Sequence, residues 1–123
     1  MKRIACAAAM LAAVFVTPAV AADHTMMLGD HYNVVGTNAD GSPYRGTADV
    51  HVISTTTFLV AWHIKGAASS GFGMRMGDTI SATYMLDGAP GLIIYRQTAN
   101  GGFKGIWAIK GQNGSGTEEW TPQ

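Results

Sequence analysis

Apolar residues alternate with polar ones through most of the chain after residue 30, and this pattern predicts β-strands. In the run 57–64 every second residue is large and apolar: Phe58, Val60, Trp62 and Ile64. A period of two places these side chains on one face of a strand. No segment after residue 22 keeps the 3.6-residue period of an amphipathic helix. The sequence therefore predicts an all-β domain.

The same alternation recurs in four further runs and predicts which side chains face the core. The predicted inward sets are Ala48, Val50 and Val52; Phe72, Met74 and Met76; Ile80, Ala82 and Tyr84; and Phe103, Trp107 and Ile109. The run 92–95 is apolar at every position, so its inward phase stays open. Each alternating run should present one face to a shared core.

Eight strands are predicted in all, and turns rich in glycine separate them. The strands are 31–36, 44–53, 57–64, 71–76, 79–86, 91–97, 103–109 and 117–121. Asp40-Gly41, Gly77-Asp78 and Asp87-Gly88 carry the residues that hairpin turns favour. These links are too short for a crossover helix, so neighbouring strands should pair antiparallel.

A meander of eight strands leaves two exposed edges unless the sheet closes on itself. We therefore expect an eight-stranded antiparallel up-and-down barrel with closure of the avidin or lipocalin type; the alternative is a two-sheet β-sandwich. An eight-stranded barrel is wide enough only to be filled by side chains or to hold one small ligand. The bulky inward aromatic residues favour a filled core.

The first 22 residues have the pattern of a secretory signal peptide. Lys2 and Arg3 precede a short apolar run, and small residues follow it, with cleavage expected after Ala21 or Ala22. The apolar run is shorter than the ~20 residues that a membrane-spanning helix needs. We expect a periplasmic or secreted protein without membrane insertion, with 23–123 as a single barrel domain.

Composition excludes some stabilising features and some classes of partner for this domain. Cys6, the one cysteine, lies in the leader, so no disulfide stabilises residues 23–123. Without Lys2 and Arg3, six basic residues face eight acidic ones, a net charge of about −2. No basic run is present to bind phosphates, which argues against nucleic acid as a partner.

No enzyme signature stands out, and we expect a non-enzymatic protein that needs no cofactor. Glu118 and Glu119 are adjacent, so on a strand they point to opposite faces, and both are interpreted as solvated charges. His51 and His63 lie on consecutive predicted strands, opposite the core face. In a suitable register they would approach each other, but two imidazoles alone are a weak metal signal.

Three aromatic residues are the candidates for ligand binding: Trp62, Tyr84 and Trp107. All three share the inward phase of their strands, where they would either fill the barrel or line a ligand site at its mouth. If they fill it, Trp62 and Trp107 should both be buried. Trp120 lies near the C-terminus and is expected to close one end of the barrel.

The N-terminus that signal cleavage creates is a candidate metal site. Cleavage after Ala21 would place His24 third, so that the free amine, two backbone amides and the imidazole could surround Cu(II) or Ni(II) in a square plane. Met26, Met27 and His31 would add further copper ligands. Cleavage one residue later places His24 second and breaks the site; the alternative is a tail that binds no metal.

Four segments resemble a family of small exported alphaproteobacterial proteins that are often labelled fibronectin-binding proteins. They are GTNADGSPYRGTADV at 36–50, GFGMRMGD at 71–78, GLIIYRQ at 91–97 and GIWAIKGQNGSGTEEWTPQ at 105–123. Together they span most of the predicted domain. Members of this family often have cysteines where Phe58 and Gly73 stand here, which implies a cross-link between the third and fourth strands that this chain lacks.

Three functions are consistent with these observations. The first is an exported binding module for an extracellular matrix protein such as fibronectin, as the resemblance implies, with contacts through the loops 38–44 and 110–116. The second is a carrier of one small apolar ligand in the barrel. The third is the copper-binding tail.

Overall fold

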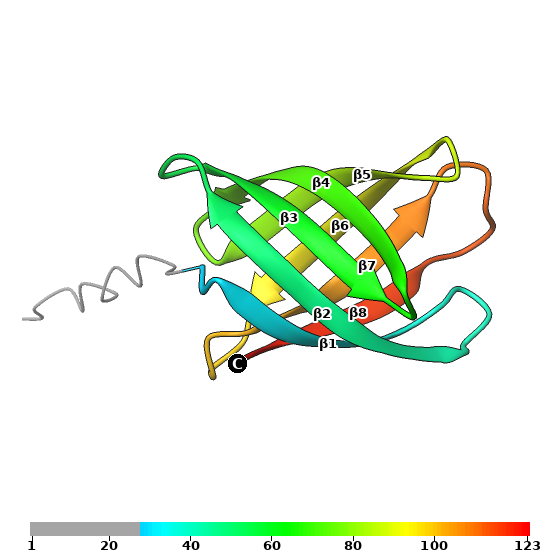
Figure 1. The fold of residues 1–123 in the computed structure, drawn as a ribbon, viewed down its shortest axis with the longest axis horizontal. Coiled ribbons are helices and arrows are strands. Elements are labelled where there is room, and N and C mark those ends of the chain that lie inside the picture. The colour runs from blue at the N-terminus through cyan, green and yellow to red at the C-terminus, as the bar shows by residue number, and fades with distance from the viewer. Residues whose placement is uncertain (1–27) are drawn as a thin grey trace, which may run out of the picture.

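The computed structural model describes residues 28–123, and it confirms a closed barrel of eight antiparallel strands in chain order (Figure 1). The strands are β1 (His31–Thr37), β2 (Pro43–Val52), β3 (Thr57–Ile64), β4 (Ala67–Met76), β5 (Thr79–Leu86), β6 (Ala89–Gln97), β7 (Phe103–Ile109) and β8 (Gly116–Pro122). Every predicted strand is present. No helix long and apolar enough to cross a membrane occurs in residues 28–123.

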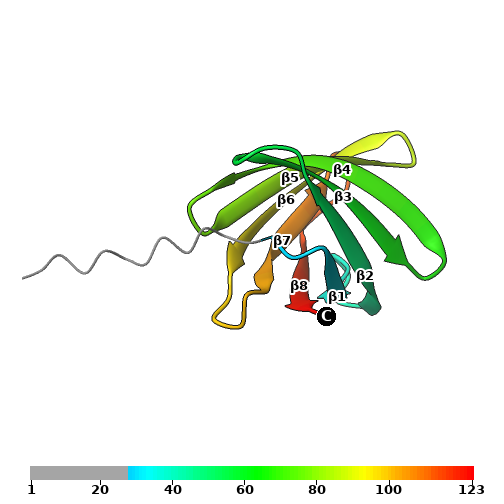
Figure 2. The same cartoon turned by 60° about the vertical axis from the view of Figure 1, so that its left-hand side comes forward.

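The first and last strands close the sheet. β1 pairs with β8 from Tyr32↔Pro122 to Thr37↔Thr117, and the two strands lie side by side in Figure 2 as well. This pairing removes both edges, so the structure excludes the two-sheet sandwich. The fold therefore encloses one interior, which the inward side chains share.

Two hairpins are tighter than predicted, and they lengthen the strands beside them. Lys65 and Gly66 both have positive φ, as do Asp87 and Gly88, which is the pattern of a two-residue type I′ turn. Pairing therefore begins at Ala67, four residues before the predicted start of that strand. The predicted loop at 65–70 is wrong because small residues such as alanine and serine carry little strand signal.

The inward phase is confirmed in β3, β5 and β7 but is wrong in β4. Phe72, Met74 and Met76 are 51%, 56% and 84% exposed and face outward. Gly71 and Gly73 face inward instead, because the neighbouring rings of Trp62 and Phe58 leave no room there for a side chain. Hydrophobicity alone does not reveal this inversion, since the residues that fit are the smallest. At the end of β2, Val52 is also exposed rather than buried.

Aromatic side chains in the interior lie across glycines on the adjacent strand. In each pair the two residues are direct cross-strand partners, and a Cβ on the glycine would lie within 2.7 Å of the ring. The pairs are Tyr44 with Gly36, Phe58 with Gly73, Tyr84 with Gly91, Tyr95 with Gly105 and Trp107 with Gly116. Glycine thus lets a narrow barrel hold several large rings. Phe58 and Gly73, the two positions of the cross-link that the resemblance implies, are thus direct cross-strand partners.

One end of the barrel, here called the closed end, is sealed by side chains. It lies at the turns 53–56, 77–78 and 98–102, and both the first described residues and the C-terminus are there (Figure 1). Tyr32, Phe58, Ile80 and Phe103 are 0% exposed. Leu28 packs against the same cluster, and the Gly29 N–H donates to the Tyr32 hydroxyl at 2.6 Å. This half of the interior matches the predicted filled core.

Candidate ligand pocket at the open end of the barrel

The opposite end, here called the open end, contains a cavity of about 230 Å³. It lies at the turns 38–42, 65–66 and 87–88 and the loop 110–115. Tyr44, Trp62, Tyr84 and Trp107 line it, with Glu118 among them. A ligand would meet four aromatic side chains from four strands and one acidic group.

Ring contacts between strands that are not neighbours in the sheet arrange these aromatic walls. Tyr84 packs against Trp62 with ring centroids 5.4 Å apart, and Tyr44 packs edge-on against Trp107 at 6.3 Å. Trp107 is fixed further by its indole N–H, which donates to the carbonyl of Thr117 at 3.3 Å. The cavity walls therefore consist of two pairs of contacting rings, and the closed sheet fixes the backbone of each ring-bearing residue.

Glu118 is buried, with only 5% of its surface exposed. The Tyr95 hydroxyl donates to its Oε2, and the indole N–H of Trp120 donates to its Oε1 at 3.2 Å. Its cross-strand neighbours are Gly36 and Gly105. The expectation that Glu118 is solvated is therefore wrong: it is the residue of the Glu118-Glu119 pair that points into the barrel.

The environment of Glu118 shifts the pKa values of the groups around it. Burial raises the pKa of Glu118, while the hydrogen bonds from Tyr95 and Trp120 and the nearby donor groups of Tyr44 and Trp62 act in the opposite direction. Burial and the charge of Glu118 raise the pKa of Tyr84 to about 12, and they also raise those of Tyr44 and Tyr95. The tyrosines thus stay protonated at neutral pH, and Tyr44 and Tyr84 contribute their rings to the lining of the pocket.

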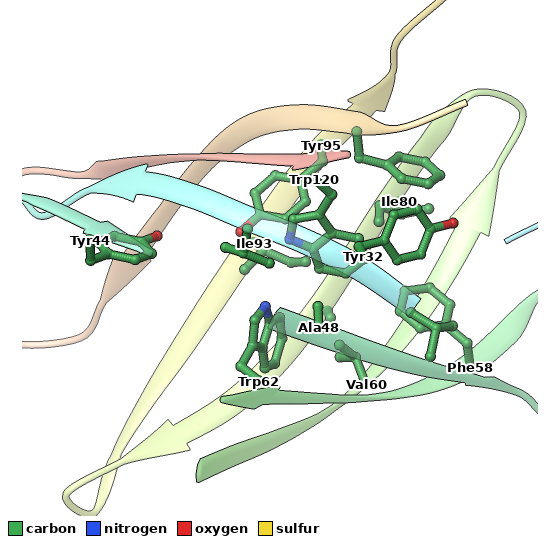
Figure 3. Packing of buried hydrophobic residues seen from close by; sticks show 14 residues of the cluster. Tyr32, Tyr44, Ala48, Phe58, Val60, Trp62, Ile80, Ile93, Tyr95 and Trp120 are labelled. Carbon is green, nitrogen blue, oxygen red and sulfur yellow. The ribbon is translucent and has the colours of Figure 1, made fainter. Parts of the chain in front are cut away.

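Trp62 has a buried indole N–H that completes no hydrogen bond within residues 28–123. It points into the same space as the Tyr95 hydroxyl and the Trp120 nitrogen (Figure 3). It lies close enough to Glu118 to lower the pKa of the carboxyl, although it completes no hydrogen bond with it. A buried donor without a partner costs about 1–3 kcal/mol, so this one is available to a ligand.

The three predicted ligand-binding residues do converge. Trp62, Tyr84 and Trp107 all line the cavity, although Trp107 is only half-buried, contrary to the expectation of burial. Trp120 does not close an end; it lies in the centre, 0% exposed, in ring contact with Tyr32, Trp62, Tyr95 and Phe103. Sequence reasoning missed Glu118, although alternation from Trp120 back through the strand would have placed it inward.

The histidines do not meet in the way that the sequence suggested. His51 lies opposite Leu59 and His63 lies opposite Thr47, so four strand positions separate the two imidazoles. Instead, the Nδ1 of His31 is 2.7 Å from Oδ1 of Asp49, and the Nε2 of His63 is 3.6 Å from Oδ2 of Asp49. This cluster lies on the outer surface.

Metal binding gains no support from the part of the chain that the structure covers. No group of three or more histidine, cysteine, aspartate or glutamate residues within 28–123 is placed to hold a metal ion. His24, Met26 and Met27 lie outside the described residues, so the copper-binding tail stays a prediction. Of its proposed ligands only His31 is described, and it is paired with Asp49.

A wider hollow of about 730 Å³ lies over the outer face of β2 to β5. Leu59 and Phe72, direct cross-strand partners, contribute to its floor and are about half exposed. Two acidic residues, Asp30 and Asp49, line it, and Asp49 already interacts with His31 and His63. The outer hollow thus lacks the buried and unpaired polar groups of the open-end cavity, which is the stronger candidate for a small ligand.

Three solved structures are similar to this chain over 82% of its length. They are a redesigned β-barrel (22% identity, TM-score 0.64, 96% of that chain covered), a de novo designed fluorescence-activating β-barrel (17%, 0.61, 98%) and EF1p2_mFAP2b bound to DFHBI (18%, 0.66, 98%). The chain matches no model of a known protein family and no curated protein. At these identities the similarity establishes the barrel fold.

Proposed function

We propose that this domain is a non-enzymatic binding protein for one small ligand, which it holds in the cavity at the open end of the barrel. The observation that carries this proposal is the presence of two buried polar groups in a cavity lined largely by aromatic rings. One is the carboxyl of Glu118, and the other is the indole N–H of Trp62, which has no hydrogen-bond partner. Ligand sites are typically apolar clefts with a few convergent polar groups. The open end has this composition, and the closed end does not.

The size of the cavity limits the ligand. About 230 Å³ is below the range of roughly 300–1,000 Å³ that is typical of pockets for drug-sized molecules. The ligand is therefore smaller than a drug, or only one group of it enters the barrel. Among the similar barrels, one is fluorescence-activating and another is bound to DFHBI, so ligand binding is compatible with this fold.

Binding to fibronectin or another matrix protein stays a prediction that rests on the resemblance. The loops proposed for it, 38–44 and 110–116, surround the mouth of the same cavity. A partner that covers these loops would compete with a small ligand for the open end. No contact within residues 28–123 favours this function over the small-ligand one.

A thermal-shift screen tests the proposal with a matched pair of variants. Ser69 lies opposite Trp62 and lines the cavity, so Ser69→Leu should fill it, while Ser70→Leu makes the same change on the outer face. A ligand at 100 times its Kd stabilises a protein by about 2.7 kcal/mol. For a domain of this size that raises Tm by roughly 10 °C.

We expect small amines, alcohols or acids from the screen to raise the Tm of the wild type and of Ser70→Leu, and to lose that effect in Ser69→Leu. The fluorescence of Trp62, Trp107 and Trp120, all in or beside the cavity, should change with the same ligands. A ligand that stabilises all three proteins equally binds elsewhere and contradicts the proposed site.

A further inference from the structure

We infer that the ligand is a small organic cation of the quaternary-ammonium type, with Glu118 as its counter-charge and the four aromatic side chains as its walls. The inference rests on the proposed function and adds the charge class of the ligand. It follows from the chemistry of the donors around Glu118, the absence of a counter-ion beside it and the arrangement of the rings.

The groups around Glu118 suit a carboxylate ion. The indole N–H of Trp120 can only donate, and it occupies Oε1, while the Tyr95 hydroxyl is within hydrogen-bond distance of Oε2. The Trp62 N–H, also a donor only, lies near the same carboxyl without completing a hydrogen bond to it. An ionised carboxyl accepts at both oxygens, so these donors match the charged form of Glu118.

This charge lacks a partner within the described chain. Both ion pairs found in residues 28–123 involve Asp49, and neither includes Glu118. Lys65 is the basic residue that lines the cavity, and it is exposed at the rim, where hydrogen bonds from Ser42 and the charge of Lys65 lower the pKa of Asp40. A buried charge without a counter-ion is costly, and a bound cation would remove that cost.

The rings supply the second half of the recognition. Tyr44, Trp62, Tyr84 and Trp107 come from β2, β3, β5 and β7, so they surround the cavity from different sides. A cation within about 6 Å of a ring centroid is attracted by the negative face of the ring, most strongly when both are desolvated. A neutral molecule of the same shape gains the apolar contacts but not this attraction. The Trp62 N–H would pair with an acceptor oxygen on the cation.

Two probes of nearly the same shape separate charge from size. Choline carries a quaternary ammonium and a hydroxyl, and 3,3-dimethylbutan-1-ol replaces the nitrogen with carbon and is neutral. Titration calorimetry of the purified protein at about pH 7.5 should give at least roughly tenfold tighter binding for choline, since desolvated cation–π contacts reach about 2 kcal/mol each. Equal binding would overturn the cation inference and leave the proposed function standing. If neither probe binds while a neutral or anionic molecule from the screen does, the cation inference is wrong and the proposed function still stands.

A matched pair of variants assigns the effect to Glu118. Glu118→Gln should reduce choline affinity at least tenfold without weakening the neutral alcohol, and Glu119→Gln, the same change on the neighbouring residue, should leave both affinities unchanged. The rings remain in Glu118→Gln, so some preference for choline persists; a choline affinity equal to that of the wild type contradicts the assignment.

A pH series of the wild-type protein tests the same point without a variant that must fold. The titratable groups facing Glu118 are Tyr44, Tyr84 and Tyr95, whose raised pKa values keep them protonated across acidic and neutral pH, and Lys65 lies exposed at the rim. Choline affinity should therefore fall as acid protonates Glu118, while the affinity of the alcohol stays constant. Choline affinity that does not change between about pH 4 and pH 8 would overturn the inference.

Discussion

The two halves of the barrel interior contain the same kinds of side chain but pack them differently. At the closed end Tyr32, Phe58 and Phe103 are completely buried, Leu28 packs against the core, and Gly29 bonds to Tyr32. At the open end Tyr84 and Trp107 are only half-buried and border a cavity. Trp120 lies between the two halves and contacts rings on both sides. An aromatic interior is thus not evidence for either a filled barrel or a ligand site.

The polar groups distinguish the two halves. At the closed end the Tyr32 hydroxyl accepts a hydrogen bond from the Gly29 N–H, three residues away in the chain. The open end holds a buried carboxyl and an indole N–H without a partner. Because an unsatisfied buried donor destabilises a fold, the unpaired N–H of Trp62 beside a buried carboxyl is the feature that makes the open end the candidate for binding.

The largest expected effect compares two aromatic residues on one strand. Phe103 and Trp107 both face inward from β7, but Phe103 lies at the closed end and Trp107 at the cavity. Phe103→Ala should lower the free energy of unfolding by about 3–5 kcal/mol, as other buried aromatic truncations do. Trp107→Ala should cost about 1–2 kcal/mol because solvent can enter the space it leaves. Urea unfolding measures both, and equal losses would show that the open end is packed as tightly as the closed end.

A smaller effect is expected from adding a methyl group beneath one ring in each half. In Gly73→Ala the new Cβ would lie 2.3 Å from the Phe58 ring and 2.7 Å from the carbonyl oxygen of Ser81. Neither neighbour can move away within the sealed core, so we expect a loss of about 1–3 kcal/mol.

Gly91→Ala is the matched change at the open end. The three atoms nearest its new Cβ all belong to the Tyr84 ring, the closest at 2.3 Å, and this ring borders the cavity, into which we expect it to turn. We expect a stability loss below about 1 kcal/mol together with weaker ligand binding, because the displaced ring occupies the site. A Gly91→Ala protein as destabilised as Gly73→Ala would show that the cavity gives Tyr84 no freedom.

The fold was predictable because its signals are local. The alternation of Phe58, Val60 and Trp62 marks a strand face, and Asp87-Gly88 marks a hairpin turn, without reference to the rest of the chain. β4 shows where this reasoning fails. Its inward positions are glycines that fit beneath rings from other strands, so the large residues of the segment face solvent. Only the paired structure reveals that complementarity.

The candidate site was half predictable for a related reason. Trp62, Tyr84 and Trp107 share the apolar phase of their strands and were identified from it. Glu118 breaks the expectation that inward positions are apolar, and its burial depends on donors from β6 and from its own strand, Tyr95 and Trp120. A charged residue in the inward phase of a strand is the signal that would have indicated the site.

The smallest expected effect is the pH dependence that Glu118 gives to stability. Its pKa is raised in the folded protein by burial, although four donors oppose the shift. Between the unfolded and the folded pKa the native state therefore holds more protons than the unfolded chain, so stability decreases as pH rises through this window. Above the folded pKa this loss of stability is complete, and the ionisation of Glu118 no longer makes stability change with pH. For most carboxyls in ion pairs stability instead increases as pH rises, because their folded pKa values are lowered.

Urea unfolding from about pH 4 to pH 8 isolates this contribution when two variants are compared. Glu118→Gln cannot ionise, so its stability relative to the wild type should rise with pH across the window. Glu119→Gln should follow the wild type, since Glu119 lies on the outer face of the same strand. If the difference between Glu118→Gln and the wild type stays constant with pH, Glu118 is not desolvated in the folded protein, and the polar contrast between the two halves of the barrel is lost with it.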